Sequence, residues 1–454
     1  MKNSILKIYS KLGIHSARTK NISKHVFLSF FYKGGSILAS FLLVPLTINF
    51  LDTENYGIWL TLSSFIAWFS FFDIGLGHGL RNKFAEARAN NNLELAKGYV
   101  STAYLTITIV AFVTFIIFII VNYFVDWTKV FNTSNSLFND LKLLMPIVFG
   151  FFCLQLIVKL ITTIYLADQK HSMQGKIGFI TAAFSLLVIW LLSMFSKSSL
   201  LLFGTVFSAI PIIILVILNL FSFTNTYKSV KPSLSFFKKK YLKDIFGLGF
   251  TFFIIQISGI ILFSTDNFII AKLFTPAEVV PYNIAYKYMS ISQMVFAIIL
   301  APYWSSVTEA YIKKDFKWVK MAMKNLTKFA LVFILLIIVM VLVAPISYKL
   351  WIGNSVSIPF TLTMAMALYF ILTIIYKPFT YFVNGTGKIR LQMYSIALTA
   401  LLNIPLSIFI VSNTEYGVTG VIIATIICII PHTILCPLQY NKLINNRATG
   451  LWNK

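Results

Sequence analysis

Charge is scarce in this 454-residue chain, and acidic charge is the scarcest. Charged residues make up 11% of the sequence, with 14 Asp and Glu against 38 Lys and Arg. A soluble domain typically carries about a quarter charged residues and slightly under half apolar ones, whereas 58% of this chain is apolar. Such a chain could not cover its surface with polar groups in water. The composition therefore excludes a soluble protein and predicts a polytopic membrane protein.

Cysteine is almost as scarce, with three residues in the whole chain. Cys153, Cys428 and Cys436 all fall within apolar stretches, and no two of them form a C-x-x-C pair. This pattern excludes a disulfide framework, and we expect no metal site. The sequence also lacks an RNA-binding or zinc-finger signature, so its net charge of +24 does not predict a nucleic-acid partner.

Long apolar runs are what the chain has in abundance. About 20 apolar residues cross the hydrocarbon layer as a helix, and that length predicts an all-α membrane protein with about 12 transmembrane helices. The first run follows a basic leader and is too long for the apolar core of a signal peptide, so we expect it to remain as a span. The predicted spans are 26–50, 56–76, 100–124, 143–165, 177–195, 199–223, 246–270, 282–302, 329–350, 358–382, 391–411 and 417–438.

Lysine and arginine alternate between consecutive loops. The N-terminal leader, every second loop after it and the C-terminal tail hold 28 of the 38, the intervening loops hold 4, and the remaining 6 lie in or at the edges of spans. Cytoplasmic loops carry such an excess under the positive-inside rule. Both termini are therefore expected in the cytoplasm, which an even number of spans also requires.

The longest basic loop has six predicted spans on either side, and the two halves share short matches in the same order. Tyr56 after the first span matches Tyr282 after the seventh, and Glu86 after the second matches Glu309 after the eighth. These matches predict a parallel repeat of two six-helix bundles, a duplication typical of transporters with a substrate path between the halves. The basic loop itself is expected to lie beside anionic lipid headgroups. The predicted domains are a bundle at 1–223, a cytoplasmic linker at 224–245 and a bundle at 246–454.

Polar residues share one helix face within six of the spans, and in the eighth span they recur at steps of three or four. Because polar groups are costly in hydrocarbon, we expect these faces to line a protein interior or a water-filled cavity. The first, second, fourth, seventh, eighth and tenth spans then form this cavity. The fullest faces are Asn283, Tyr286, Lys287, Ser290 and Gln293 in the eighth span and Tyr369, Thr373, Lys377, Thr380 and Asn384 in the tenth.

Most of the charged groups inside the spans are four lysines, Lys33, Lys159, Lys287 and Lys377. A lysine at mid-bilayer costs around 2.5–3.5 kcal/mol on insertion scales. Lys159 and Lys377 lie close enough to the inner face to reach it along their stems, so anchoring is an equal alternative for these two. A lysine-rich cavity suits an anion such as phosphate, pyrophosphate or an acidic sugar. We expect the four lysines to bind substrate, with Asn283 and Tyr286 contacting its sugars.

Two carboxylates, Asp73 and Asp266, share these polar faces. Each is either an ion-pair partner for a lysine or the carrier of a coupling proton, because a carboxylate withdrawn from water takes up a proton more readily. We expect no cofactor, and we expect coupling to a proton or sodium gradient.

Three motifs of the first half resemble the bacterial polysaccharide flippase family of the multidrug/oligosaccharidyl-lipid/polysaccharide exporter (MOP) superfamily. They are Leu51-Asp-Thr-Glu-Asn-Tyr-Gly-Ile-Trp59, Asp73-Ile-Gly-Leu-Gly77 and Arg81-Asn-Lys-Phe-Ala-Glu-Ala87. In the second half, Asp266-Asn-Phe-Ile-Ile270 and Tyr282-Asn-Ile-Ala285 are similar to the family's repeat of this pattern. The resemblance covers nearly the whole chain. It implies two six-helix bundles around a cavity that opens alternately to each side.

The resemblance also implies a function, that of a non-enzymatic flippase in the bacterial inner membrane. Its implied cargo is an undecaprenyl-diphosphate-linked oligosaccharide, moved to the periplasmic leaflet for O-antigen or capsule synthesis. The expected partners are this substrate, inner-membrane lipids and polysaccharide polymerase machinery. The second half departs from the family pattern at Val279-Val-Pro281, where a Gly is expected before the tyrosine. Twelve spans rather than fourteen favour the O-antigen or capsule branch over the lipid II branch.

Two other functions remain open at this point. A multidrug cation antiporter of the same superfamily needs carboxylates in its cavity, whereas lysines outnumber carboxylates inside these spans. A membrane polysaccharide polymerase or glycosyltransferase is expected to carry a large outer loop with catalytic arginines, or a D-x-D motif. The sequence has neither feature.

Overall fold

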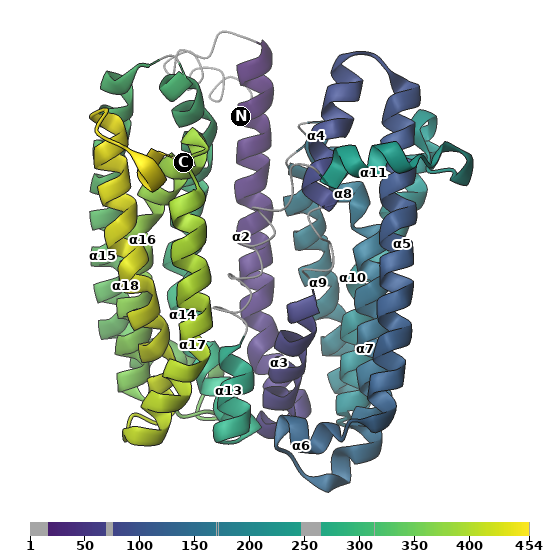
Figure 1. Ribbon diagram of the computed structural model, residues 1–454. Helices are drawn as coiled ribbons and strands as arrows, with labels where there is room; N and C mark the ends of the chain where they lie inside the picture. The colour runs from purple at the N-terminus through teal and green to yellow at the C-terminus, as the bar shows by residue number, and fades with distance from the viewer. Residues whose placement is uncertain are drawn as a thin grey trace, which may run out of the picture. The chain divides into compact units, whose positions relative to one another are not determined.

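The computed structural model describes residues 17–69, 76–168, 170, 172–246, 265–312 and 314–453 (Figure 1). Within these residues the secondary structure is helical, without a β-strand, as the sequence predicts. Nine of the described helices are long and apolar enough to cross a membrane, and each coincides with a predicted span. The protein is therefore an all-α integral membrane protein. Predicted spans 56–76 and 246–270 extend outside the described residues, and the total of twelve and the cytoplasmic termini stay predictions.

Contacts divide the chain into two compact units. Unit 1 spans Met1–Phe50, Phe72–Val125 and Leu143–Gly249, and unit 2 spans Leu51–Phe71, Asp126–Lys142 and Phe250–Lys454. Two helices from the first half of the sequence, α3 (Thr53–Trp68) and α6 (Trp127–Phe131), therefore pack in unit 2. The division at 1–223, 224–245 and 246–454 concerns the sequence repeat, and it stays a prediction.

Unit 1 is built around helix α4, which packs against the long helix α5 and against α8. Its buried core includes Leu80 and Phe84 of α4, Val100 of α5 and Ile161 of α8. Asn92 caps α5 by accepting a hydrogen bond from the backbone N–H of Leu95. The helices of this unit are α2 (Ala17–Leu51), α4 (Leu76–Ala89), α5 (Leu93–Phe124), α7 (Phe138–Val158), α8 (Leu160–Ala167), α9 (Ser172–Phe195), α10 (Leu200–Thr224) and α11 (Lys239–Phe246).

The predicted linker 224–245 is a docked part of unit 1. It contains two 3-10 turns, η3 (Lys228–Val230) and η4 (Leu234–Phe236), followed by α11. Tyr227 is buried in the core, and its hydroxyl donates to Asp168 Oδ2 at 2.9 Å. Burial, together with this hydrogen bond, raises the pKa of Tyr227, so the hydroxyl stays a donor.

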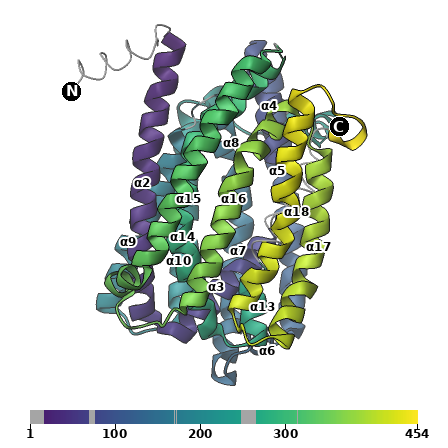
Figure 2. The same cartoon turned by 90° about the vertical axis from the view of Figure 1, so that its left-hand side faces the viewer.

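Unit 2 is centred on α16, which packs against α14, α15 and α18 (Figure 2), while α17 packs on α18. Asp315 caps α15 by accepting from Trp318 N–H, and most of the predicted loop 303–326 is helical because α14 and α15 both extend into it. Besides α3 and α6, the helices of this unit are α13 (Asp266–Leu273), α14 (Val279–Ile312), α15 (Phe316–Ile352), α16 (Phe360–Thr386), α17 (Arg390–Asn413) and α18 (Thr419–Ile444).

Candidate substrate-binding and coupling residues

Lys33 lies on α2, next to a glycine that allows close packing within unit 1. A Cβ atom on Gly35 would lie 2.4 Å from the Phe179 ring, so α2 and α9 approach closely at this point. Phe31 and Tyr32 also contact Phe179, with ring centroids 6.4 and 6.1 Å away. The Lys33 side chain is exposed on unit 1.

Lys159 marks a break in the predicted span 143–165, where α7 ends and α8 begins. The N–H of Thr162 donates to the Lys159 carbonyl at 2.9 Å, three residues back instead of four. The Val158 carbonyl therefore loses its usual helical donor, which is costly inside a membrane. The Lys159 side chain is exposed on unit 1 at this break.

A side chain of α10 satisfies the carbonyl that the break leaves free. Asn219 Nδ2 donates to the Val158 carbonyl at 2.7 Å, and Asn219 Oδ1 accepts from the Tyr104 hydroxyl at 2.7 Å. Sequence analysis missed both residues. The signal was an Asn in an otherwise apolar run, because a polar group buried in a span needs a partner.

Asp266, Asn267 and Asn283 form a polar cluster in unit 2. The Tyr282 hydroxyl donates to Asp266 Oδ2, and the other oxygen, Oδ1, makes no hydrogen bond within the described residues. Asn283 Nδ2 donates to Asn267 Oδ1 at 2.7 Å, and Asn267 Nδ2 donates to Ser64 Oγ of α3 at 2.8 Å. Asp266 is 6% exposed, and no lysine of the described residues pairs with it.

A buried polar stripe on α17 was missed by sequence analysis, although its steps of three and four residues would have revealed it. Its five members are 0–9% exposed. Four of its oxygens find no hydrogen-bond partner in the described part of the chain: Gln392 Oε1, Ser395 Oγ, Asn403 Oδ1 and Ser407 Oγ. The five residues are Gln392, Ser395, Thr399, Asn403 and Ser407.

This stripe and the Asp266 cluster belong to one polar region of unit 2. Asn403 Nδ2 donates to Thr425 Oγ1 of α18 at 3.0 Å. The Cys428 thiol, also on α18, lies beside Asn403 and within the electrostatic field of Asp266. Helix α13 accordingly packs against both α17 and α18.

Tyr286 is part of an aromatic group between α14 and α16. Its ring centroid lies 6.3 Å from that of Tyr369 and 5.3 Å from that of Phe370. Tyr369 and Phe370 are buried, whereas Tyr286 is partly exposed. The predicted polar faces of the eighth and tenth spans therefore meet at these rings.

Lys287 and Lys377 lie on the same two packed helices, and both are partly buried. Within the described residues Lys377 makes no hydrogen bond or ion pair. Near it, Thr380 Oγ1 lies 3.3 Å from His432 Nε2, and the Tyr376 ring packs edge-on against the imidazole. This contact explains His432 as a packing residue of α18.

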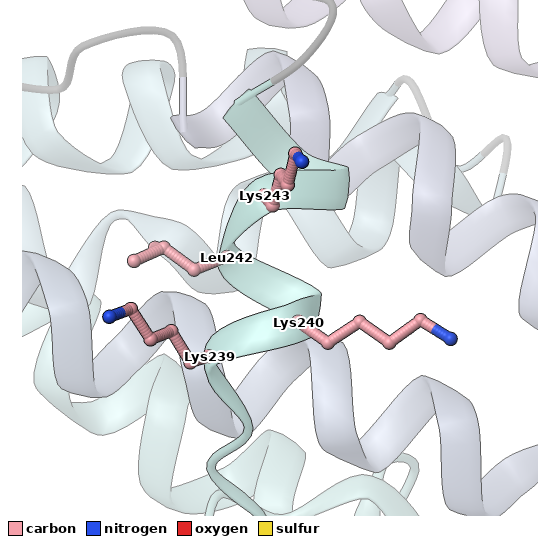
Figure 3. Close-up of a pocket in the computed structure, with 4 residues that line it drawn as sticks. All are labelled: Lys239, Lys240, Leu242 and Lys243. Carbon is pink, nitrogen blue, oxygen red and sulfur yellow. The ribbon is translucent and has the colours of Figure 1, made fainter.

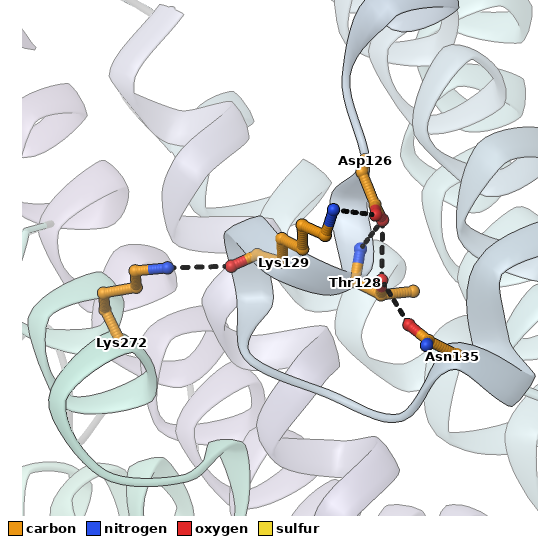
Figure 4. A network of polar contacts seen from close by, with 5 residues as sticks. All are labelled: Asp126, Thr128, Lys129, Asn135 and Lys272. Atoms are coloured by element: carbon orange, nitrogen blue, oxygen red, sulfur yellow. Dashed lines mark hydrogen bonds and ion pairs between the residues drawn. The ribbon is translucent and has the colours of Figure 1, made fainter.

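The segment around α6 joins α13 through backbone and side-chain contacts (Figure 4). Asp126 Oδ1 accepts from the N–H and Oγ1 of Thr128 at 3.1 and 2.6 Å, and Lys129 Nζ lies 3.5 Å from Asp126 Oδ2. Thr128 Oγ1 also lies 3.3 Å from Asn135 Oδ1, and Lys272 Nζ donates to the Lys129 carbonyl at 2.9 Å. The hydrogen bond from the Thr128 side chain is the main cause that lowers the pKa of Asp126.

The segments that match each other in the sequence repeat are in direct contact in unit 2. A Cβ atom on Gly57 would lie 1.8 Å from the Pro276 carbonyl oxygen, which only a glycine permits. Asn132 Nδ2 donates to the Phe274 carbonyl at 2.7 Å. We call this contact, together with the Lys272–Lys129 hydrogen bond, the repeat seam.

The structure thus places three of the predicted site residues, Asp266, Asn283 and Tyr286, near the junction of α13 and α14 in unit 2. Lys287 and Lys377 share the packed pair α14 and α16, whereas Lys33 and Lys159 belong to unit 1. Asp73 lies outside the described residues. The roles of all these residues in binding and coupling stay predictions. No group of three or more His, Cys, Asp or Glu in the described residues is arranged to hold a metal ion.

The fold is that of a transporter class with solved structures. An inward-facing multidrug resistance MATE family transporter of the MOP superfamily superimposes with a TM-score of 0.70 at 13% identity, covering 92% of this chain and 96% of the other. An outward-facing structure of a transporter described in the same words gives 0.65 at 13% identity, covering 93% and 96%. These similarities define the class of fold.

The family follows from the sequence. The family model described as "Polysaccharide biosynthesis protein" matches residues 22–307, and the chain belongs to this flippase family of the MOP superfamily. A Yersinia pseudotuberculosis protein described as a candidate O-antigen export protein is 24% identical, covering 85% of this chain and 88% of its own. A candidate O-antigen transporter of Salmonella typhimurium is also 24% identical, covering 70% of each chain.

Proposed function

We propose that this protein is a flippase for undecaprenyl-diphosphate-linked oligosaccharide repeat units. It moves them by alternating access across the bacterial inner membrane for O-antigen or capsule synthesis, with both termini in the cytoplasm. The family membership carries the proposal, and the names of its Yersinia and Salmonella relatives support the O-antigen branch.

The lysines supply the chemistry for the diphosphate of the cargo. Lys287 and Lys377 place positive charge inside unit 2, and Lys377 has no carboxylate partner in the described residues. An ammonium group in a low-dielectric site interacts with a phosphate more strongly than in water. Lys33 and Lys159 add exposed positive charge on unit 1. Multidrug export of cations is a poorer fit because it needs the opposite charge.

Tyr286 and its aromatic neighbours suit the sugars of the same cargo. Tyr286 is the partly exposed member of the group with Tyr369 and Phe370, so part of its side chain is accessible to a sugar. Asn283 donates to Asn267 and to the Val279 carbonyl in this conformation, so it would have to exchange these bonds to contact sugar.

Asp266 is our choice for the coupling residue. Its Oδ1 makes no hydrogen bond in the described residues, and unpartnered oxygens of Asn403 and Ser407 lie on a helix packed against α13. Such a set of oxygens suits a proton or a sodium ion, since hard cations take oxygen ligands. In this proposal the ion binds when Asp266 is reached from one side and leaves when the site opens to the other.

The repeat seam is suited to act as the outer gate. It lies at and just beyond the ends of the predicted spans, on the side that the positive-inside rule places in the periplasm. Its contacts are a glycine packed on a carbonyl and hydrogen bonds to main-chain oxygens, which can separate without breaking an ion pair.

A bacterial strain whose own gene is deleted tests the proposal. We expect loss of surface polysaccharide and accumulation of intact lipid-linked repeat units on the cytoplasmic leaflet. Wild type should rescue both defects, whereas Lys287→Ala and Lys377→Ala should not. Lys349→Ala, which changes an exposed lysine at the end of α15, is the matched control and should rescue. Repeat units that reach the periplasm but remain unpolymerised in the deletion strain would instead indicate a polymerase.

A further inference from the structure

Helix α11 has two faces of opposite character. Its apolar face packs on unit 1, where the Tyr241 ring lies 5.0 Å from the Tyr99 ring and Ile245 is fully buried. Three exposed lysines point away from that core, on the opposite face of the helix. They are Lys239, Lys240 and Lys243.

Hydrogen bonds hold this helix and the turn before it in place. The Ser233 N–H donates to Ser101 Oγ at 3.1 Å, and the Tyr99 hydroxyl donates to Asp244 Oδ2 at 3.3 Å. Ser101 and Tyr99, which make these two bonds, both lie in the N-terminal part of α5. The lysines therefore stand on a fixed support rather than on a free linker.

Apolar side chains next to the lysines are also exposed. Leu234 is 77% exposed and Phe237 is 38% exposed, in the turn that leads into α11. The end of α10 is similarly uncovered, with Leu220 64% and Phe221 61% exposed, as expected of a helix surface that faces lipid. The turn thus begins 13 residues after Phe221, and α11 begins 18 residues after it.

Helix α11 runs across α5 rather than along it, and the two helices are in contact (Figure 1). An amphipathic helix in this orientation, with lysines beside Leu and Phe, has the composition of helices that lie in the membrane interface. The three lysines project in different directions from α11 (Figure 3), although they border the same open pocket with Leu242. They therefore suit several separate phosphates better than one enclosed anion.

We propose that α11 and the turn 234–238 form a binding surface for anionic phospholipid headgroups. These headgroups belong to the leaflet that surrounds the C-terminal end of α10. The lysines contact headgroup phosphates, while Leu234 and Phe237 insert at the level of the upper acyl chains. Asp244 is the carboxylate of this helix, and its hydrogen bond with Tyr99 directs it toward α5. The inference is independent of the transported substrate.

The test uses the full-length protein in nanodiscs of phosphatidylcholine with increasing phosphatidylglycerol. A polarity-sensitive dye is attached at Phe237→Cys, since the native cysteines Cys153, Cys428 and Cys436 are buried. We expect a blue shift of the dye as phosphatidylglycerol increases. Lys239→Gln/Lys240→Gln/Lys243→Gln should weaken headgroup binding by roughly fivefold for each lysine removed and should therefore lose most of the blue shift. The corresponding Lys→Arg triple variant should respond as the native sequence does.

A charge-matched control separates the cluster from overall charge. Lys176→Gln/Lys197→Gln/Lys349→Gln removes three exposed but scattered lysines and should leave the response unchanged. The proposal is overturned if the α11 triple variant titrates as the native sequence does, or if the scattered variant loses the response equally. It is also overturned if inorganic pyrophosphate produces the same shift in pure phosphatidylcholine, because the site would then take a free anion.

Discussion

At the scale of single residues, two buried or partly buried polar side chains of the described chain are paired with uncharged partners on neighbouring helices. Asp266 pairs with Tyr282, and Asn219 pairs with Tyr104. The sequence predicted that Asp266 is either the ion-pair partner of a lysine or the carrier of a coupling proton. Its bond to Tyr282 was not predictable, because helical spacing relates residues within one helix and these two join across the turn from α13 to α14.

Removing the Tyr282 hydroxyl should destabilise unit 2. Tyr282→Phe leaves both oxygens of the buried Asp266 without a donor in the described residues, at an expected cost of about 1–3 kcal/mol. Thermal unfolding in detergent measures the loss. Tyr416→Phe, on an exposed side chain, is the control and should change little. Equal stability of the two variants would mean that the hydrogen bond between Tyr282 and Asp266 does not stabilise unit 2.

Asp126 should make the stability of the loop around α6 depend on pH in the acidic range. Hydrogen bonding from Thr128 lowers the pKa of Asp126 in the folded state, below an unfolded value of about 3.9. The stabilisation is therefore complete above that value and is lost as pH falls through the folded-state pKa. Asp126→Asn should melt below wild type at pH 7, and this gap should narrow below about pH 4. The difference in melting temperature between Thr128→Val and wild type should narrow in the same way. A difference that is constant with pH would contradict the prediction.

At the scale of helices, apolar length located the spans, but tertiary contacts decided where helices break. The stretch around Lys159 contains no proline or glycine, whereas Pro146 and Pro211 lie inside helices that continue. The break at Lys159 was therefore not predictable from local sequence. Asn219 stabilises it from another helix by bonding the carbonyl that the break frees.

A double-mutant cycle should measure the coupling between Tyr104 and Asn219. Combining Tyr104→Phe with Asn219→Leu is expected to show a coupling of roughly 0.6–1.7 kcal/mol, the range found between membrane helices. The coupling is calculated from the free energies of unfolding of wild type, the two single variants and the double variant. The same cycle with Asn225→Leu, an exposed residue after α10, should be additive. Additivity at Asn219 as well would show that the bond contributes nothing.

Gly57 should tolerate no side chain, because the repeat seam brings a carbonyl against it. The Cβ of Gly57→Ala would lie 1.8 Å from the Pro276 oxygen, so backbone must move and stability should fall by about 1–3 kcal/mol. Gly178→Ala is the matched control, since nothing lies within 4 Å of its added Cβ. It should raise stability by up to about 1 kcal/mol, the helix preference of alanine over glycine. The melting temperatures of both variants decide, and an unaffected Gly57→Ala would refute the close contact.

At the scale of the whole molecule, composition and span length were sufficient to predict an all-α membrane protein, and motifs were sufficient to identify the family. The repeat matches at Tyr56 and Tyr282 proved to lie in segments that contact each other through Gly57 and Pro276. The sequence could not show that contact, because an internal repeat shows which segments are equivalent but not which segments pack together. Within the predicted linker 224–245, Tyr227 and Ile245 are buried in the core of unit 1, and local sequence did not predict this packing.

The flippase assignment rests on movement of a lipid-linked oligosaccharide that depends on intramembrane lysines. The most direct measurement is the transfer of a fluorescent undecaprenyl-diphosphate-linked oligosaccharide between the leaflets of vesicles that contain the purified protein. Wild type and Lys349→Ala should transfer it, and Lys287→Ala/Lys377→Ala should be slower by about tenfold or more, the effect of losing roughly 1.4 kcal/mol. Transfer no faster than in protein-free vesicles, or equal transfer by the double lysine variant, would contradict the account.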